Sequence, residues 1–376
     1  MRTILVVLGT RPEVIKLFPV MMRLNKLNYN IVLCNTEQQK NLSRQALKLF
    51  GLKPDYCLAV MKNNQSLADT QANILKKLDI VLEQNCFDAV IVQGDTLSAF
   101  CGALAGFYKH LPIFHIESGL RTNDIYEPFP EEAYRKMISC ISTLHFAPSI
   151  QAKRNLIREG VSKNAIFVTG NTIIDTLAYY IQNLQYLSKQ RFRENNILPN
   201  KKNVLITIHR RENHTKIKQI LLSIKKLSHN FQQYRYIVLL HPNPNVKSIM
   251  QQELINDKNI FLLEPLNYDE LIGLMCQCTL IMTDSGGIQE EAAYLGISTV
   301  ILRDKTERQE ILRFPHIRLA GTNPNNIYEA ASEFLKKTLK NQIKKYTIYG
   351  TGHSAEKIEH HISLFFSENC KGNNTP

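Results

Sequence analysis

The sequence has no long hydrophobic run, and no apolar stretch approaches the roughly 20 residues that a membrane-spanning helix needs. The apolar segment 3–8 runs directly into residues 9–12 and has no small-residue cleavage site, so we interpret it as a buried first strand and not as a signal peptide. The eight cysteines are scattered, and the close pair Cys276 and Cys278 lacks the second ligand pair of a zinc site. These absences favour a cytoplasmic protein with neither a membrane span nor a metal centre.

Several catalytic motifs are also absent. The G-x-G-x-x-G fingerprint does not follow the first predicted strand, where residues 9–13 offer a single glycine, and this argues against a nicotinamide cofactor. There is no serine elbow, Walker loop or H-E-x-x-H motif. The net charge of +13 admits nucleic acid, an anionic membrane or a phosphorylated ligand as partner. The basic runs are diffuse and have no interleaved aromatic residues, so we do not expect nucleic-acid binding.

The 376 residues, of which 44% are hydrophobic, suffice for two domains of average size. Short continuous apolar runs alternate with amphipathic stretches such as 67–82 and 217–227. The runs are 4–8, 31–34, 89–92, 112–116, 144–147 and 166–168, then 204–208, 236–240, 260–263, 280–282, 299–302 and 317–320. Runs without alternation are typical of strands buried on both faces, so the pattern predicts an α/β fold of two Rossmann-like, doubly wound domains. We place the first domain at 1–172, joined by a C-terminal helix at 354–376, and the second at 173–353, with a polar linker at 190–202.

Functional side chains follow many of these runs. The segments are 9–13, 93–96, 115–121, 209–213, 241–245, 283–287 and 303–308. Ligands of open parallel sheets bind beyond the carboxyl ends of the strands. One or two helix caps per strand end would be unremarkable, but acids, histidines and arginines recurring at one edge of both sheets predict a shared active site in the interdomain cleft.

Ser285, Gly286 and Gly287 fall at the start of a predicted helix, where free backbone N–H groups favour phosphate and glycine allows close approach. Glu291, about one turn later, could accept hydrogen bonds from a ribose. The alternative is a capped helix with acidic residues in its first turn. Arg11 and Lys16 are candidate cations for a diphosphate, although Lys16 could equally be an exposed helix lysine.

Three acids, Asp95, Glu117 and Glu131, follow adjacent predicted strands or open the next helix. Clustered carboxylates raise one another's pKa, which would provide a general acid and a general base in one pocket. For Glu131 the alternative is a first-turn acid after Pro130 that stabilises the helix dipole.

Together these segments resemble the non-hydrolysing UDP-N-acetylglucosamine (UDP-GlcNAc) 2-epimerases. The matching motifs, in family order between residues 2 and 352, are Gly9-Thr-Arg-Pro-Glu, Gly94-Asp-Thr, His115-Ile-Glu-Ser-Gly-Leu-Arg-Thr, Pro128-Phe-Pro-Glu-Glu, Val168-Thr-Gly-Asn-Thr, His209-Arg-Arg-Glu-Asn, His241-Pro-Asn-Pro, Asp284-Ser-Gly-Gly-Ile-Gln-Glu-Glu and Leu302-Arg-Asp with Thr306-Glu-Arg. The resemblance implies a GT-B-like pair of Rossmann domains with UDP in the cleft. It also implies interconversion of UDP-GlcNAc and UDP-N-acetylmannosamine (UDP-ManNAc), by elimination and re-addition of UDP, without metal or NAD.

Carried over residue by residue, the resemblance implies a catalytic set and a substrate-binding set. Asp95 and Glu131 are assigned to proton movement at C2, and Glu117 and His209 to the groups around the departing UDP. The substrate-binding residues are Arg11, Lys16, Arg135, His241, Ser285, Gly286, Gly287, Glu291 and Arg308. We expect a homodimer that binds a UDP-sugar, feeds cell-envelope polysaccharide synthesis, and binds neither nucleic acid nor membrane.

The sequence departs from the family pattern at Gln39 and Gln93, where the family has histidine, and at Ser118, where it has alanine. Gln39 lies in a loop that some members use to bind an activating second UDP-GlcNAc, so that regulation is not predicted here. Four other functions stay open. They are a hydrolysing epimerase that releases ManNAc and UDP, an epimerase of a related UDP-amino sugar, a glycosyltransferase of the same architecture, and a catalytically silent nucleotide-sugar sensor.

Overall fold

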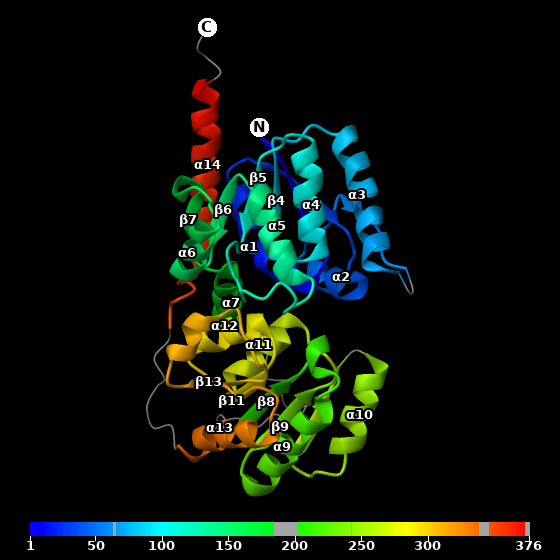
Figure 1. Ribbon diagram of the computed structural model, residues 1–376, viewed down its shortest axis with the longest axis vertical. Coiled ribbons are helices and arrows are strands. Elements are labelled where there is room, and N and C mark those ends of the chain that lie inside the picture. Colours follow the sequence, from blue (N-terminus) through cyan, green and yellow to red (C-terminus); the bar gives the residue numbers. More distant parts are fainter. Residues whose placement is uncertain (63–64, 184–201, 242, 338–345, 373–376) are drawn as a thin grey trace. The chain divides into compact units, whose positions relative to one another are not determined.

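The computed structural model describes residues 1–62, 65–183, 202–241, 243–337 and 346–372. The chain forms two compact units, Met1–Thr176 with Tyr349–Pro376, and Leu177–Ile348. Each unit contains a parallel sheet flanked by helices, which confirms the predicted α/β class (Figure 1). The linker predicted at residues 190–202 lies outside the described residues, except for its last residue.

The first unit is built on a seven-stranded parallel sheet of order β3-β2-β1-β4-β5-β6-β7. The strands are β1 (Thr3–Leu8), β2 (Asn30–Asn35), β3 (Tyr56–Cys57), β4 (Ala89–Gln93), β5 (Ile113–Ile116), β6 (Leu144–Ala147) and β7 (Ile166–Val168). The six predicted runs are all present. The two-residue strand β3 was not predicted, because it is too short to stand out as an apolar run.

Helices connect these strands and cover both faces of the sheet. They are α1 (Arg11–Lys26), α2 (Lys40–Leu49), α3 (Leu67–Gln84), α4 (Leu97–Tyr108), α5 (Glu131–Ile141), α6 (Ile150–Arg158) and the 3-10 turn η1 (Lys163–Ala165). Helix α7 (Thr172–Asn183) follows β7, and the boundary between the two units falls within it, after Thr176. Hydroxyl side chains fix several of their starting points, since Ser66, Thr96 and Ser149 each accept a backbone N–H in the first turn of α3, α4 and α6. These N-caps therefore determine the residue at which each of these helices begins.

The C-terminal helix α14 (Ser354–Gly372) belongs to the first unit, although about half of the chain separates it from that unit's sheet (Figure 1). Its residues Ala355, Ile358, Ile362 and Phe366 are buried in the same core cluster as β1. Phe114 of β5 meets Phe366 edge-on, with ring centroids 5.9 Å apart. The first unit therefore depends on both ends of the chain.

The second unit repeats this plan with a six-stranded parallel sheet of order β10-β9-β8-β11-β12-β13. Its strands are β8 (Asn203–Thr207), β9 (Arg235–Leu239), β10 (Ile260–Leu263), β11 (Cys278–Thr283), β12 (Ser298–Ile301) and β13 (Ile317–Leu319). All six were predicted. The helices are α9 (Ile217–Asn230), α10 (Pro244–Leu254), α11 (Tyr268–Cys276), α12 (Gly286–Leu295) and α13 (Pro324–Lys336), with 3-10 turns η2 (Arg211–Asn213) and η3 (Gln309–Arg313).

In each sheet the chain adds strands first on one side of the first strand and then on its other side. In the first sheet β1 lies between β2 and β4, and in the second β8 lies between β9 and β11. A crevice opens at the carboxyl end of the strands at such a switch point, and ligands of doubly wound sheets bind there. The segments after β1, β4 and β5, and those after β8 and β11, are therefore where a site is expected in each unit.

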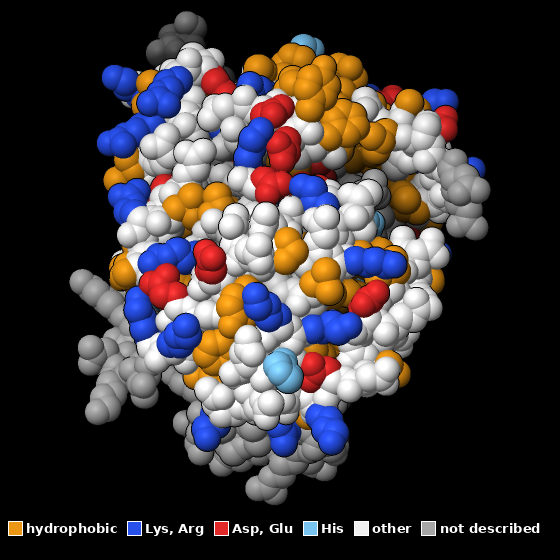
Figure 2. All heavy atoms as spheres, turned by 60° about the horizontal axis from the view of Figure 1, so that its bottom comes forward, with side chains coloured by type: hydrophobic (Ala, Val, Ile, Leu, Met, Phe, Trp, Pro, Cys, Tyr) orange, Lys and Arg blue, Asp and Glu red, His pale blue; other side chains and the backbone are white. Residues whose placement is uncertain are grey.

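No helix within the described part of the chain is long and apolar enough to cross a membrane. On the face shown in Figure 2, lysine and arginine side chains are spread over the surface with acidic side chains among them. This distribution agrees with the diffuse basic runs of the sequence.

Candidate active site

Glu117 is the centre of a buried polar cluster in the first unit. It follows β5 with a φ of 62°, a left-handed backbone conformation that turns its side chain away from the strand direction. Its Oε1 pairs with the Lys16 ammonium at 2.5 Å and accepts a hydrogen bond from Asn171 Nδ2 at 2.7 Å. Its Oε2 accepts from Gln93 Nε2. Lys16 is itself buried, so it is not the exposed helix lysine that the sequence left open.

Arg135 of α5 forms an ion pair with Asp95, another of the candidate catalytic acids. One guanidinium nitrogen lies 2.5 Å from Asp95 Oδ2 and another donates to Glu132 Oε2 at 2.8 Å. Arg135 and Glu132 are buried, whereas the Asp95 side chain remains 27% exposed. Glu131 begins α5 and lies one helical turn before Arg135, on the same face. The structure thus gives Asp95 a fixed cationic partner and leaves part of its carboxyl accessible to a ligand.

Two buried histidines support these acids from the strands behind them. His115 Nε2 lies 2.8 Å from the Gly94 carbonyl, and His145 Nδ1 lies 3.0 Å from Ser118 Oγ. Burial lowers the pKa of His115 to about 3 and that of His145 to about 4. Both rings are therefore neutral near pH 7, and the His115 N–H can donate to the turn that precedes Asp95.

Glu13, which the sequence did not single out, ties the loop after β1 to the loop after β4. Its carboxylate accepts the backbone N–H groups of Gly9 at 2.9 Å and Thr10 at 2.8 Å, and the Thr96 hydroxyl at 2.6 Å. Burial raises the pKa of Glu13 to about 7, against the effect of these donors. The segments that carry Arg11 and Asp95 are therefore held by one buried side chain.

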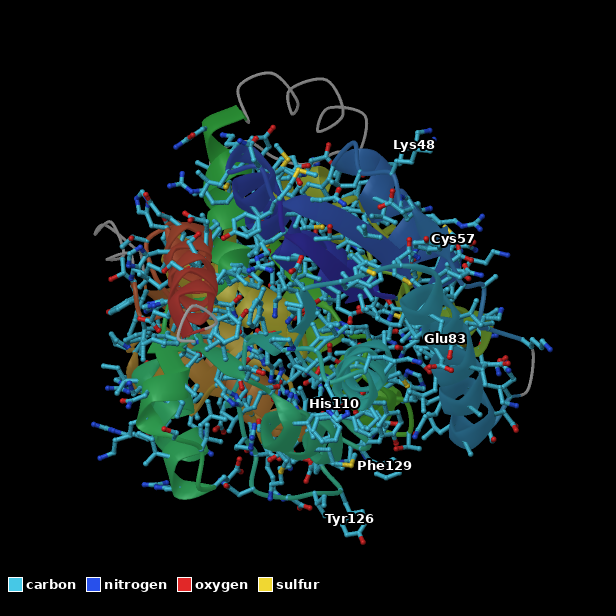
Figure 3. All side chains as sticks on the ribbon, turned by 90° about the horizontal axis from the view of Figure 1, so that it is seen from above. Lys48, Cys57, Glu83, His110, Tyr126 and Phe129 are labelled. Atoms are coloured by element: carbon cyan, nitrogen blue, oxygen red, sulfur yellow. The ribbon has the colours of Figure 1, made fainter. Side chains whose placement is uncertain are left out.

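The segment between β5 and α5 leads the chain to Glu131. Figure 3 shows Tyr126 and Phe129 projecting outward from this segment, and they are 77% and 63% exposed. The Glu132 carboxylate accepts the backbone N–H of Thr122 at 3.1 Å, which ties the start of the segment to the start of α5.

In the second unit, His209 follows β8, and its ring contacts the buried carboxylate of Asp284, which follows β11. His209 Nδ1 lies 3.0 Å from Asp284 Oδ1, and the ring side chain is 48% exposed. His241, a predicted substrate-binding residue, is buried against the same loop. Its Nδ1 accepts the Asn243 N–H at 2.9 Å, and its Nε2 lies 3.3 Å from the His209 carbonyl. Burial lowers the pKa of His241.

The predicted phosphate-binding glycines begin α12, with Ser285 as the N-cap. A Cβ at Gly286 would overlap the Arg308 guanidinium, whereas a Cβ at Gly287 would meet nothing within 4 Å. A side chain at Gly286 would thus require the Arg308 guanidinium to move, whereas Gly287 borders open space. Free N–H groups at such a helix start suit a phosphate.

Arg308 and Glu291 are both engaged within the unit. Arg308 Nε donates to Glu290 Oε1 at 2.6 Å, and another of its nitrogens pairs with Glu307. Tyr268 donates its hydroxyl to Glu291 Oε1 at 2.6 Å. Their predicted contacts with UDP are therefore additional to contacts that already hold them in place.

The structure brings Lys16, Glu117, Asp95 and Arg135 to one edge of the first sheet. It brings His209, His241 and the start of α12 to one edge of the second. Sequence reasoning missed the partners that hold them. These are Glu13, Gln93, Asn171, Asp284 and Glu307. Gln93, Asn171 and Asp284 lie directly after predicted strands or within the quoted motifs, which is the signal that could have identified them.

The chain was compared with known proteins. A family profile described as UDP-N-acetylglucosamine 2-epimerase matches residues 22–363. The UDP-N-acetylglucosamine 2-epimerase of Neisseria meningitidis is 42% identical over 338 residues, which cover 89% of this chain and 91% of the relative. That of Escherichia coli is 37% identical over 365 residues, covering 94% and 96%.

Two solved structures are similar over nearly the whole chain. The N. meningitidis UDP-GlcNAc 2-epimerase bound to UDP-GlcNAc has a TM-score of 0.90 and 39% identity, covering 97% of this chain and all of the relative. The Methanocaldococcus jannaschii enzyme in complex with UDP-GlcNAc and UDP has a TM-score of 0.86 and 31% identity, covering 97% and 100%. The two Rossmann-like units are thus of the GT-B-like class that these relatives share, and the chain belongs to the UDP-N-acetylglucosamine 2-epimerase family.

Proposed function

We propose that this protein interconverts UDP-GlcNAc and UDP-ManNAc by reversible epimerisation at C2, without hydrolysing the sugar nucleotide, and that it supplies cell-envelope polysaccharide synthesis. The observation that carries the proposal is the set of acids at the carboxyl edge of the first sheet, with Glu117 paired to Lys16 and Asp95 to Arg135. Solved relatives bound to UDP-GlcNAc support the substrate.

The proposed reaction is an elimination followed by an addition. A base removes the C2 proton, the C1–C2 double bond forms, and the electron pair of the C1–O bond leaves with UDP. The resulting 2-acetamidoglucal then receives a proton at C2 on the opposite face while a UDP oxygen re-forms the bond to C1. No electrons are gained or lost overall, so the scheme requires no hydride acceptor.

We assign the proton transfers at C2 to Asp95 and Glu131. The partial exposure of Asp95 and its fixed distance from Arg135 suit a carboxylate that must meet substrate in a defined position. Glu117 and Lys16, together with His209, are assigned to the groups around the departing UDP. The Lys16–Glu117 pair is buried, so water screens the two charges less than it would at the surface.

We assign UDP binding to the start of α12, through Ser285, Gly286 and Gly287, assisted by Arg11 of the first unit. The open space at Gly287 supports this placement, because a diphosphate can approach the backbone there. Glu291 and Arg308, held by Tyr268 and Glu290, are assigned to the nucleoside and phosphate groups. Arg135 and His241 are assigned to substrate binding, in addition to the contacts that they make with Asp95 and with the His209 loop.

The test is to incubate the purified protein with UDP-GlcNAc and to identify the products by proton NMR, with and without a chelator. We expect UDP-ManNAc at an equilibrium that can be reached from either epimer, unchanged by the chelator. Free ManNAc and UDP in equal amounts would establish the hydrolysing reaction instead. Turnover of only a different UDP-amino sugar would establish a related epimerase.

We further propose that the protein acts as a cytoplasmic homodimer. Light scattering on the purified chain tests the dimer, and fractionation of producing cells tests the compartment. A monomeric active protein would contradict the first expectation, and recovery outside the cytoplasm would contradict the second.

A further inference from the structure

A buried carboxylate lies directly behind the candidate catalytic histidine of the second unit. Thr283 at the end of β11 is in register with Thr207 at the end of β8, so the residues that follow these two strands come together. Asp284 follows β11 and has no solvent exposure. His209 follows β8 and keeps about half of its side chain exposed. The acid therefore approaches the ring from the protein side.

Asp284 binds both the backbone and the ring of the His209 loop. Its two oxygens each lie 3.1 Å from the His209 backbone nitrogen, and Oδ2 also accepts the Arg210 N–H at 3.0 Å and Asn213 Nδ2 at 2.9 Å. The same carboxylate lies 3.0 Å from His209 Nδ1. Several donors converge on one acid, so the carboxylate is held in place against the loop that carries the ring.

The carboxylate also determines which ring nitrogen carries the proton. The backbone N–H groups of His209 and Arg210 and the Asn213 side chain all donate to Asp284, and these donors favour its ionised form. An ionised carboxylate can only accept hydrogen bonds. A neutral His209 must therefore hold its proton on Nδ1, and Nε2 is left with a lone pair on the exposed side of the ring.

His241 provides the opposite case in the same unit. Its Nδ1 accepts the backbone N–H of Asn243, so a neutral His241 must carry its proton on Nε2, which faces the His209 carbonyl. Two neighbouring histidines are thus held in opposite tautomers by different partners. The difference follows from the acceptor or donor that each Nδ1 meets.

We propose that Asp284 is a positioning residue, which fixes His209 as the Nδ1–H tautomer and presents its Nε2 to the substrate as a hydrogen-bond acceptor. The inference rests on the proposed function for its meaning in turnover, but the tautomer itself does not depend on any reaction. In the Ser-His-Asp triad of serine proteases, replacing the acid by its amide leaves the geometry intact but permits the wrong tautomer, and turnover falls about ten-thousandfold.

The first test is independent of activity. The full chain is labelled with ¹⁵N-histidine and its long-range ¹H–¹⁵N spectrum is recorded at about pH 8 without substrate. His209 and His241 are assigned by the signals lost in His209→Asn and His241→Asn. We expect Nδ1–H for His209 and Nε2–H for His241. A His209 in the Nε2–H form, or averaged between tautomers, would overturn the proposal.

The second test uses Asp284→Asn with Asp257→Asn as its matched control. Asp257 accepts hydrogen bonds from Ser228 and the Asn259 N–H before β10, at the opposite edge of the same sheet. We expect Asp284→Asn to lose turnover by about a hundredfold to ten-thousandfold with UDP affinity changed by less than about tenfold, and Asp257→Asn to keep the parent rate. Turnover of Asp284→Asn close to the parent would refute the positioning role.

The two tests also separate this inference from the proposed function. If the parent protein shows no epimerase activity but His209 is in the Nδ1–H form, the proposed function fails and the positioning of the ring stands. If the parent is active but His209 is not in the Nδ1–H form, the proposed function stands and the positioning of the ring fails. Should Asp284→Asn fail to fold, the spectrum of the parent still decides the question.

Discussion

Gly286 and Gly287 are adjacent in sequence but have different surroundings, and this makes Gly287 the cleaner probe of UDP binding. We expect Gly287→Asp to fold, because a Cβ there meets nothing within 4 Å, and to lose UDP affinity by more than about a hundredfold, because it places charge and bulk at the proposed phosphate position. Calorimetric titration with UDP, together with the melting temperature, checks this expectation.

The controls for this prediction are alanine variants at both glycines. Gly287→Ala adds little bulk and no charge, so it should keep most of the affinity. Gly286→Ala should disturb Arg308, because its Cβ would overlap the guanidinium. A folded Gly287→Asp protein that binds UDP as the parent does would show that the diphosphate lies elsewhere.

Glu13 makes a pH-dependent contribution to stability whose sign follows from its surroundings. Burial raises its folded-state pKa to about 7 from 4.5, so the folded protein holds this proton more tightly than the unfolded chain. Its contribution is therefore fully present below about pH 4.5 and is lost as the pH rises through about 7. Glu13→Gln cannot titrate. We expect the stability of the parent relative to Glu13→Gln to fall by about 3 kcal/mol between about pH 4.5 and 7.5.

Urea unfolding of both proteins at a series of pH values, followed by circular dichroism, measures this difference. His115 titrates in the opposite sense but is present in both proteins, so its effect cancels. Glu83→Gln, at a side chain that is 61% exposed, serves as the control and should show no such trend. A parent-to-variant difference that is constant over this pH range would contradict the assignment.

At the scale of the element, α5 carries two adjacent acids with different expected tasks. Glu132 is buried and bonds Arg135 and the segment before the helix, whereas Glu131 is the partly buried first residue. We expect Glu131→Gln, like Asp95→Asn, to lose turnover and C2 exchange by a hundredfold to ten-thousandfold while melting stays close to the parent. Glu132→Gln should lower the melting temperature, because it weakens a buried pair.

Exchange, product formation and melting are measured on the three variants separately. Near-parent exchange and epimerisation in Glu131→Gln would reduce that residue to a first-turn acid that assists the helix, worth about 1 kcal/mol. The same result in Asp95→Asn would remove it from the proton transfers.

The C-terminal helix α14 completes the core of the first unit, and this leads to a stability prediction. Ile358 is fully buried there, whereas Leu364 on the same helix is 42% exposed. We expect Ile358→Ala to destabilise the first unit by about 2–5 kcal/mol and Leu364→Ala to change it by less than about 1 kcal/mol. Hydrogen exchange resolved by segment reports the first unit separately. Equal protection of β1 in the two variants would contradict the packing role of α14.

Elements with continuous apolar runs could be predicted from the sequence because burial on both faces leaves a local signature. The strand β3 could not, because two residues carry no periodicity. The prediction joined the C-terminal helix to the first domain but did not identify the residues against which α14 packs, since an amphipathic pattern shows only that one face is buried. For the site, the strand-end rule indicated Asp95, Glu117 and His209.

The rule did not indicate which partner holds each of these residues. The pairing of Lys16 with Glu117, and of His209 with Asp284, depends on strand order and register between segments far apart in the chain.

At the scale of the whole molecule, each unit supplies a different part of the proposed chemistry. The first unit carries the carboxylates and their cationic partners, and the second carries the helix start suited to a diphosphate and the positioned histidine.

The account is tested most directly by incubating the protein with UDP-GlcNAc in D₂O and following C2 by proton NMR. Elimination and re-addition exchange the C2 proton with solvent, so we predict deuterium at C2 in UDP-ManNAc and, as equilibrium is approached, in the recovered UDP-GlcNAc as well. Formation of UDP-ManNAc that keeps its original C2 proton would contradict proton removal by the acids. Accumulation of free ManNAc with UDP, in place of UDP-ManNAc, would contradict the re-addition of UDP.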